Sequence, residues 1–368
     1  MDSKKPFLTH LINEINKNKN NNYDDNWDYV LLGDQSKQKV TLKAKLNHIA
    51  AKLLPQKYYN DLLFYYYLKG HLDGLGYLYD KLNDDCSRQL LVQVITYRVL
   101  GHRNYKLPLS NPKYWDNLKL AESTIIDKND FINPNFREFL LHKMDLRKIG
   151  YPITFYFSPL GVLIDFIIKQ YEYNVNNKII KAAKDDVVLD CGGCWGDTAL
   201  FFSNETGSGG KVYSFEFIPS NIEIFRKNLA LNPHLSGAVR IIENPVWDKS
   251  EKKLFYKDSG PASKISDVRS EDFSGETVTI ALDDFVSKER LSKVDFIKMD
   301  IEGAELNAVK GAKETIIKFR PKLAIAVYHS LSDFYTIAQF LESLGLGYKF
   351  YFQHATIHAG ESVLFAEV

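Results

Sequence analysis

The sequence has little cysteine, almost no excess charge and no long hydrophobic run. Only three cysteines occur among 368 residues, too few for a disulfide framework, so a reducing compartment is expected. Lysine and arginine number 47 against 46 aspartates and glutamates, and such a balance gives no long-range attraction for nucleic acid. We therefore expect a cytoplasmic protein that binds no nucleic acid.

The most apolar stretch is ITFYFSPLGVLIDFIIKQY, residues 153–171. Serine, proline, glycine and aspartate interrupt it, so it is too short to span a bilayer. The N-terminal residues also lack the continuous apolar core of a secretory signal. We expect neither a transmembrane segment nor a leader.

The chain has the length of two average domains, and its pattern changes near residue 150. Residues 1–150 predict a mainly helical region. Helices are expected over 43–54 and over 86–100, the second with Asn83 or Asp84 as its N-cap and Gly101 at its end. The asparagine-rich residues 13–26 indicate a tail or loop, and prolines make 101–150 loop-rich. This region could cover an acceptor site, recruit an acceptor or form a homodimer.

Residues 151–368 alternate short apolar runs with amphipathic ones. This pattern is typical of a mainly parallel sheet covered by helices on both faces. The last two runs are joined by a short loop, which predicts an antiparallel last strand. The strands are expected at 186–191, 211–217, 239–245, 293–300, 322–329, 348–354 and 362–368. Ligands of such sheets bind at the carboxyl ends of the strands.

The stretch VVLDCGGCWGDTALFF, residues 187–202, permits two interpretations. Cys191 and Cys194 have the spacing of a redox pair at a helix N-terminus. A thioredoxin-like domain is much smaller than this sheet, however, and the remaining Cys86 is too distant to complete a structural zinc site. We therefore favour the second interpretation, a nucleotide-binding turn.

That turn combines an acid with glycines and leads into a helix. Its residues are Asp190, Gly192, Gly193, Gly196, Asp197 and Thr198. Glu216 follows twenty positions after the last glycine, at the end of the next strand, where a carboxylate can accept hydrogen bonds from ribose hydroxyls. The spacing differs from the dinucleotide signature, and an acid beside the glycines would repel a pyrophosphate. It could attract a sulfonium or ammonium group, which favours S-adenosylmethionine over NAD.

Several segments together resemble the FkbM-type S-adenosylmethionine-dependent methyltransferases. They are VVLDCGGCWGDTAL, VYSFEFIPSN, LDDFV, VDFIKMDIEGAELNAVKGA, PKLAIAVYH and ESVLFAEV, of which KMDIEGAE is the most specific. The resemblance covers residues 151–368 and implies a class I, Rossmann-like methyltransferase fold. It also implies O-methylation of a hydroxyl, often on a sugar or glycan.

The resemblance assigns the methionine part of the cofactor to residues 190–198, the ribose to Glu216 and the adenine to residues 243–247. The cofactor-binding candidates are Asp190, Gly192, Gly193, Gly196, Asp197, Thr198, Glu216, Phe217, Asn244, Val246 and Asp300.

The catalytic candidates follow the predicted strands. Methyl transfer from a sulfonium is an in-line displacement, and a sugar hydroxyl needs a base or a metal to take its proton. Asp300, Glu302, His329 and His354 are expected to converge on one rim. They could supply a histidine base oriented by an acid, or hold a divalent ion such as Mg²⁺ or Mn²⁺. Residues of second rank are His358, Asp333 and Tyr328, and Glu361 begins the last strand.

The sequence thus predicts an S-adenosylmethionine-dependent O-methyltransferase that acts on a hydroxyl of a sugar or glycan. Two alternatives stay open: an NAD-dependent oxidoreductase on a Rossmann-like sheet, and a non-catalytic interaction protein that retains the methyltransferase fold.

Overall fold

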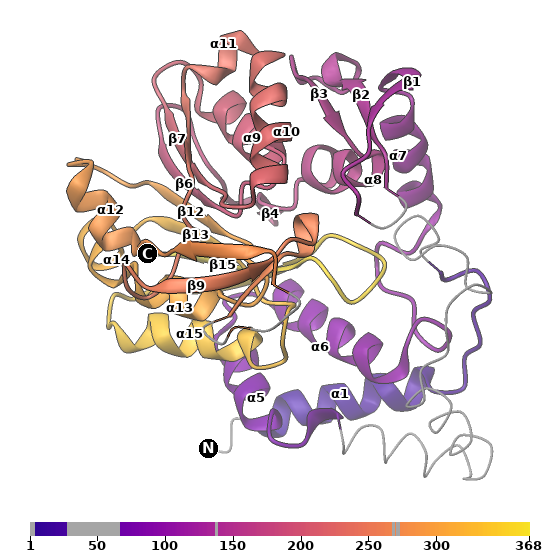
Figure 1. Cartoon of the computed structure of the whole chain (residues 1–368). Helices are drawn as coiled ribbons and strands as arrows, with labels where there is room; N and C mark the ends of the chain where they lie inside the picture. Colours follow the sequence, from indigo (N-terminus) through magenta and orange to yellow (C-terminus); the bar gives the residue numbers. More distant parts are fainter. Residues whose placement is uncertain (1–3, 28–66, 137–138, 267–268, 270–272) are drawn as a thin grey trace.

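A seven-stranded sheet forms the centre of the computed structural model, which describes residues 4–27, 67–136, 139–266, 269 and 273–368 (Figure 1). The strand order is β14-β15-β13-β12-β6-β7-β8. The bounds are β6 Val187–Cys191, β7 Lys211–Phe215, β8 Val239–Ile242, β12 Phe296–Met299, β13 Lys322–Ala326, β14 Lys349–His354 and β15 Ser362–Glu367. Each of these strands lies within a run that the sequence predicts as β-structure.

β15 is the antiparallel strand. It lies between β13 and β14 and pairs antiparallel with both, whereas the pairs from β13 to β8 are all parallel. The prediction of an antiparallel last strand is confirmed. The carboxyl ends of the parallel strands therefore meet at one edge of the sheet, where class I folds bind their ligands.

Both faces of the sheet are buried, because alternate residues of each strand point to opposite sides. In β6, Leu189 and Cys191 belong to one apolar core and Val188 belongs to the other. The first face packs against α12 (Leu282–Lys288), α13 (Glu305–Lys310), α14 (Lys313–Phe319) and α15 (Asp333–Ser343). The second face packs against α7 (Pro112–Glu122), α9 (Asp197–Thr206), α10 (Pro219–Ala230) and α11 (Pro233–Ser236).

The N-terminal helices extend the first core. They are α1 (Lys4–Asn18), α5 (Leu72–Lys81) and α6 (Asp85–Leu100) (Figure 1). α5 packs against α15, α6 packs against β14, and α1 packs against α5 and α6. Asp84 caps α6 by accepting a hydrogen bond from the Ser87 N–H at 2.7 Å, and Gly101 ends the helix with φ 76°. The predicted helix over 43–54 lies outside the described residues.

The tail or loop expected at residues 13–26 is wrong for its first part, because α1 continues to Asn18. Phe7, Leu11 and Ile15 occupy one face of this helix and are buried. Its spacing of apolar residues at every fourth position overrides the low helix propensity of the asparagines. Asn26 is also buried, and its side chain donates hydrogen bonds to two backbone carbonyls, of His102 and Tyr105.

A small antiparallel sheet lies where the sequence indicates loops. It consists of β1 (Ile125–Ile132), β2 (Leu141–Asp145) and β3 (Thr154–Phe157). The pairing of β2 with β3 crosses residue 150, the boundary that the composition suggests between two domains. That boundary stays a prediction, although the sheet ties the two sides together.

Two irregular segments border the ligand edge of the sheet. One leads from β3 through α8 (Pro159–Val162) into a π-helical turn, η3 (Leu163–Ile168). The other is the 3-10 turn η4 (Gly260–Ala262), inserted between strands β9 (Lys253–Lys257) and β10 (Lys264–Ser266), with β11 (Gly275–Val278) completing that sheet. Among the helices of the described residues, none combines the length and apolar character needed to cross a membrane.

Candidate active site

Two adjoining cavities lie at the carboxyl ends of β6 and β12. The narrow cavity, of about 70 Å³, contains Glu216, Phe217 and Val246. The wide cavity, of about 460 Å³, contains an acidic group and an aromatic group of side chains. The acids are Asp165, Asp197, Asp300, Glu302 and Glu361, and the aromatic residues are Phe136, Phe139, Phe157, Tyr171, Trp195 and Tyr328. Gly192, Cys194, Pro261 and Asp300 border both cavities.

The turn after β6 separates the two cavities and requires glycine. Gly192 has φ +93°, and a Cβ there would lie 1.9 Å from the carbonyl oxygen of Asp300. Gly196 has φ +87°, and its Cβ would lie 2.3 Å from the ring of Phe225. Gly193 would bring a Cβ within 2.2 Å of the Ser214 hydroxyl. The backbone therefore passes close to the β12 loop and to α10, which a side chain would prevent.

Asp190 lies beneath this turn and does not line either cavity. Its carboxylate is fully buried, accepts hydrogen bonds from Thr198 and Ser214, and pairs with the Lys298 ammonium at 3.2 Å. Lys298 also donates to the carbonyl oxygen of Gly192 at 2.6 Å. The attraction of Asp190 for a cationic ligand, expected from the sequence, is thus met by Lys298, and Asp190 instead fixes the turn and the start of α9.

Cys191 and Cys194 belong to the turn and do not form a redox pair. Cys86, Cys191 and Cys194 form no disulfide. Burial, followed by the charge of Asp190, raises the pKa of the Cys191 thiol well above its usual value, and burial also raises that of Cys194. A redox pair needs a stabilised thiolate, so the redox interpretation of the Cys-x-x-Cys spacing has no support in this geometry.

Glu216 lines the narrow cavity at the end of β7 and is buried. Its Oε1 atom accepts hydrogen bonds from the backbone N–H groups of Phe217 and Ile218, at 2.6 and 2.8 Å, and Asn221 donates to Oε2 at 3.3 Å. Burial raises the pKa of Glu216 to about 7, against the opposing effect of these donors. The carboxylate is held rigidly and has acceptor capacity left for a ligand hydroxyl.

The structure brings seven of the eleven predicted cofactor residues to the cavities. Phe217 and Val246 line the narrow cavity, Asp197 and Thr198 line the wide one, and Gly192 and Asp300 border both. Asn244 lines neither cavity, because its side chain donates to the carbonyl oxygen of Val278 at 2.9 Å. Asp190, Gly193 and Gly196 also line neither cavity, and they shape the turn instead.

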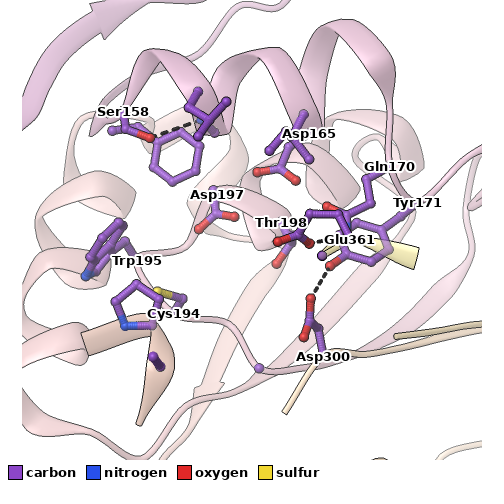
Figure 2. A pocket seen from close by; sticks show the side chains of 18 of the residues that line it. Ser158, Asp165, Gln170, Tyr171, Cys194, Trp195, Asp197, Thr198, Asp300 and Glu361 are labelled. Atoms are coloured by element: carbon purple, nitrogen blue, oxygen red, sulfur yellow. Dashed lines mark hydrogen bonds between the residues drawn. The ribbon is translucent and has the colours of Figure 1, made fainter. Parts of the chain in front are cut away.

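Asp300 follows β12 and faces the wide cavity between two phenols. The hydroxyl of Tyr171 donates to it at 3.0 Å, and that of Tyr328 lies 3.1 and 3.2 Å from its two oxygens. Burial, followed by the charge of Asp300, raises the pKa of both phenols above their usual value. Both phenols therefore remain protonated donors, and Figure 2 shows Tyr171 reaching Asp300 across the cavity.

His329 lies behind Asp300 among three carboxylates. Its Nε2 atom is 3.5 Å from Asp300 and 3.7 Å from Glu302, and its Nδ1 atom is 3.2 Å from Glu305. Burial lowers the pKa of His329, but these carboxylates outweigh burial and raise it to about 11. The imidazole is therefore a cation at neutral pH, and a role as general base requires that it first lose its proton.

The same cluster has the arrangement of a metal site. It contains Glu305, which the sequence did not predict, in place of Glu302 and His354. Ligand atoms of Asp300, Glu305 and His329 lie within 4.8 Å of one another. Glu305 is buried, and its Oε2 atom has no hydrogen-bond partner among the described residues. Glu305 belongs to the first turn of α13, so its position depends on how the loop after β12 folds back.

His354 does not join this group. It is the last residue of β14 and is buried, and its Nδ1 atom lies 2.8 Å from the Ser362 hydroxyl. Burial, followed by the charges of His358 and Arg98, lowers its pKa to about 3. The expectation that four residues converge on one rim thus holds for Asp300, Glu302 and His329, whereas His354 belongs to the packing between β14 and β15. Of the residues of second rank, Tyr328 and His358 line the wide cavity.

Sequence reasoning missed the residues that the wide cavity takes from other segments. Asp165 comes from η3, and Gln170 from the loop after it; Gln170 donates to Glu361 at 2.8 Å. Burial, followed by the charge of Asp300, raises the pKa of Glu361 to about 7. Glu361 also has a backbone φ of +63°, which is uncommon outside glycine. Asp165 could have been noticed in the sequence, because it is the one charged residue within the apolar run at 153–168.

The cavities fit S-adenosylmethionine by their chemistry. The glycine turn leaves the space that a Cβ would fill, Glu216 offers acceptors in the narrow cavity, and Asp197 has a buried Oδ1 atom without a hydrogen-bond donor among the described residues. A nucleoside with a cationic tail would complement these three features.

Residues 183–350 match the sequence pattern of the methyltransferase FkbM domain. A search among curated proteins found no match. The fold is similar to the crystal structure of methyltransferase FkbM from Methylobacillus flagellatus KT, with 16% identity, a TM-score of 0.51 and coverage of 82% of this chain and 60% of that one. The chain thus spans less than two thirds of that protein.

Two further structures are more remote. A putative O-methyltransferase from Klebsiella pneumoniae has 12% identity and a TM-score of 0.34, over 77% of this chain and 99% of that one. An O-methyltransferase from Bacillus cereus in complex with SAH has 12% identity and a TM-score of 0.34, over 70% and 91%. The sequence match and the shared fold with the Methylobacillus flagellatus protein agree, and residues 183–350 are similar to the methyltransferase FkbM domain.

Proposed function

We propose that the protein is an S-adenosylmethionine-dependent O-methyltransferase that acts on a hydroxyl of a sugar or glycan. The observation that carries this proposal is the joining of the two cavities at the glycine turn, with Glu216 in one and a ring of acids in the other. The lining of the first cavity suits the ribose of a nucleoside through Glu216, and the acids of the second suit a cationic tail and an acceptor. An NAD pyrophosphate would instead meet Asp197 at the start of α9, where a carboxylate repels phosphate.

In this proposal the narrow cavity orients the adenosine. The Glu216 carboxylate accepts hydrogen bonds from the ribose hydroxyls, and Val246 lies against the base. The bound cofactor supplies an electrophilic methyl group. The chain's own contribution is to hold acceptor and donor in line, which accounts for much of the rate of a displacement.

Asp300 and Glu302 are the proposed proton acceptors, because both carboxylates line the wide cavity. His329 supports them as a cation, at 3.5 and 3.7 Å respectively. The alternative is a divalent ion held by Asp300, Glu305 and His329, which would polarise the acceptor hydroxyl. A metal ion can bind His329 only after the imidazole loses its proton. A chelator should therefore abolish activity if the metal is needed, and should leave activity unchanged if a carboxylate is the base.

The lining of the wide cavity supports a sugar acceptor. Aromatic rings can cover the apolar face of a pyranose, and carboxylates can accept hydrogen bonds from its hydroxyls. The six aromatic and five acidic side chains named above provide both kinds of contact.

We further propose that the N-terminal helices position the acceptor site. Arg98 of α6 donates hydrogen bonds to the carbonyl oxygens of Tyr328 and Ala359, at 2.9 and 2.7 Å. Both loops contribute to the wide cavity. Dimerisation through this region and a cytoplasmic location remain part of the proposal.

Two measurements test the proposed function. Isothermal titration should show binding of S-adenosylmethionine at micromolar concentrations and no binding of NAD. Transfer of a labelled methyl group to a panel of neutral glycosides and nucleotide sugars, with and without EDTA, should then identify the acceptor. Retained activity in EDTA supports the carboxylate base, and activity restored by Mn²⁺ supports the metal. Absence of cofactor binding would overturn the proposal.

A further inference from the structure

Glu361 is the last residue before β15, and its side chain lines the wide cavity. Its backbone φ is +63°, in the left-handed region that favours glycine. A residue with a side chain pays for this conformation in free energy, and such strain gathers at ligand sites. Figure 2 shows the side chain within the cavity, with Gln170 beside it.

An uncharged amide holds this carboxylate. The side chain of Gln170 donates to the Oε2 atom of Glu361 at 2.8 Å, and Gln170 is itself buried. Among the described residues, no lysine, arginine or histidine comes within ion-pair distance of Glu361. The carboxylate therefore has a neutral partner, and its Oε1 atom has acceptor capacity left for a ligand.

Two other acids of the wide cavity have partners within the chain. Asp300 accepts hydrogen bonds from the phenols of Tyr171 and Tyr328 at 3.0 and 3.1 Å. Glu302 shares the imidazolium of His329 with Asp300, at 3.7 and 3.5 Å. The chain thus supplies both carboxylates with charged or strongly polar neighbours.

The remaining two acids are also provided for. Asp165 and Asp197 interact with each other, and the charge of Lys298 acts on both. Among the described residues that line the wide cavity, Lys298 is the only lysine or arginine, and its ammonium group pairs with Asp190 at 3.2 Å. This cation is therefore committed to the glycine turn and its neighbours.

Negative charge dominates the surroundings of Glu361. Burial, followed by the charge of Asp300, raises its pKa to about 7, and Glu302 acts in the same direction. The amide of Gln170 and the imidazolium of His329 oppose this rise without cancelling it. A cationic group on a ligand would hold the carboxylate ionised, whereas a phosphate would be repelled by it and by Asp300.

We infer that Glu361 binds an ammonium group of the acceptor, so that the acceptor is an amino sugar rather than a neutral or phosphorylated sugar. This inference rests on the proposed function and deepens it, because it specifies the charge of the acceptor. The ammonium group donates to the Oε1 atom of Glu361, and the aromatic lining covers the apolar face of the same sugar ring. Gln170 is then a positioning residue, because it fixes the second carboxylate oxygen.

The test compares sugars that differ mainly in charge, with the full-length protein and labelled S-adenosylmethionine at pH 7. The acceptors are the methyl glycosides of glucosamine, galactosamine and mannosamine, their N-acetyl derivatives, and the 6-phosphates of the three parent hexoses. The variant is Glu361→Gln, which preserves shape and removes the charge. Glu367→Gln is the matched control, because it makes the same change at the other end of β15, where Glu367 pairs with Lys178.

The wild type and Glu367→Gln should use the amino glycosides with a kcat/KM about 10- to 100-fold above that for the N-acetyl derivatives, the usual value of a charge-assisted hydrogen bond. The phosphates should be the poorest acceptors. Glu361→Gln should reduce the ratio to less than about threefold, while its affinity for S-adenosylmethionine in calorimetry stays that of the wild type, which also checks folding.

The other outcomes separate this inference from the proposed function. Equal use of amino and N-acetyl glycosides, a preference for neutral or phosphorylated sugars, or an unchanged ratio in Glu361→Gln would overturn the inference alone. Transfer to none of these sugars by a protein that binds S-adenosylmethionine would overturn the inference and the sugar acceptor together. A wild type that does not bind S-adenosylmethionine would overturn the proposed function itself.

Discussion

The two cavities differ in where their residues come from. All residues that line the narrow cavity lie between Gly192 and Ala304, inside the stretch that matches the methyltransferase FkbM domain. The wide cavity adds residues from before and after that stretch, including Phe136, Asp165 and Glu361. The first cavity is therefore built within the matched stretch alone, whereas the second also needs segments outside it.

In the proposed function, this difference separates cofactor recognition from acceptor recognition. The cavity proposed for the nucleoside is built from loops at the ends of neighbouring strands. The walls of the cavity proposed for the acceptor include residues of η3, of the loop before β15 and of the small sheet formed by β1, β2 and β3 with its connecting loop. A substitution in the narrow cavity should therefore affect nucleoside binding, and one in the wide cavity should affect the other part of the site.

The largest effect is expected where the cavities meet. In Gly192→Ala the new Cβ would lie 1.9 Å from the Asp300 carbonyl oxygen, at a φ of +93°. We expect a loss of about 3 kcal/mol of unfolding free energy, measured in urea, and loss of binding in both cavities. Gly207→Ala is the matched control, because its φ is +67° and nothing lies within 4 Å of its Cβ. It should cost about 1 kcal/mol, and an equal cost for both variants would contradict the close-approach argument.

The next effect concerns the cation behind Asp300. The folded-state pKa of His329, about 11, exceeds its ordinary value of 6.5. The stabilisation it provides is therefore fully present below pH 6.5 and is lost as pH rises toward 11. Between pH 7.5 and 9.5 the unfolding free energy should fall by about 1 kcal/mol per pH unit. His329→Asn should remove this slope and cost about 3 kcal/mol at pH 7, because three carboxylates lose their cation.

The control for that slope is His234→Asn. His234 lies on the surface, with its Nε2 atom 2.9 Å from the Pro152 carbonyl oxygen. Urea unfolding at several pH values should give the wild-type slope for this variant. If the slope also persists in His329→Asn, the imidazolium is not its source.

A smaller effect is expected from Glu216, and it should be the same for every adenosine ligand. Glu216→Gln should weaken methylthioadenosine and S-adenosylhomocysteine by a similar factor of about 10 to 100, because both need the carboxylate for the ribose. Since the pKa of Glu216 is raised to about 7 by burial, wild-type affinity for methylthioadenosine should also fall as pH drops below 7. Titration calorimetry at pH 5.5 and 8 measures this, and an affinity independent of pH would argue against ribose binding by Glu216.

The sequence allowed the narrow cavity to be predicted better than the wide one. The glycine turn, Glu216 and Val246 follow strands whose ends are visible as local patterns, so their convergence follows from parallel order. Asp165 could not be placed, because its position depends on a π-helical turn packed against α9. The charge of His329 was only partly visible, since it arises from Glu302 and Asp300 after β12 and also from Glu305, in a helix that folds back beneath it.

The errors have the same physical origin. Asp190 was assigned to a ligand because Lys298, more than a hundred positions away, could not be seen as its partner. His354 was placed on the rim because it ends a strand, but its side chain faces Ser362 of the neighbouring strand. A pattern gives the end of a strand, whereas the direction of a side chain there depends on the loops that follow.

The smallest expected effect tests this last point within the narrow cavity. Asn244→Ala should change affinity for S-adenosylhomocysteine by less than about twofold, because the side chain donates to Val278 and lines neither cavity. Val246→Ala, two residues later, removes a buried side chain that does line the cavity. It should weaken binding about 3- to 10-fold through lost apolar contact. Titration calorimetry compares the two variants directly, and a larger loss for Asn244→Ala would show that residues 243–247 contact the adenine through their polar side instead.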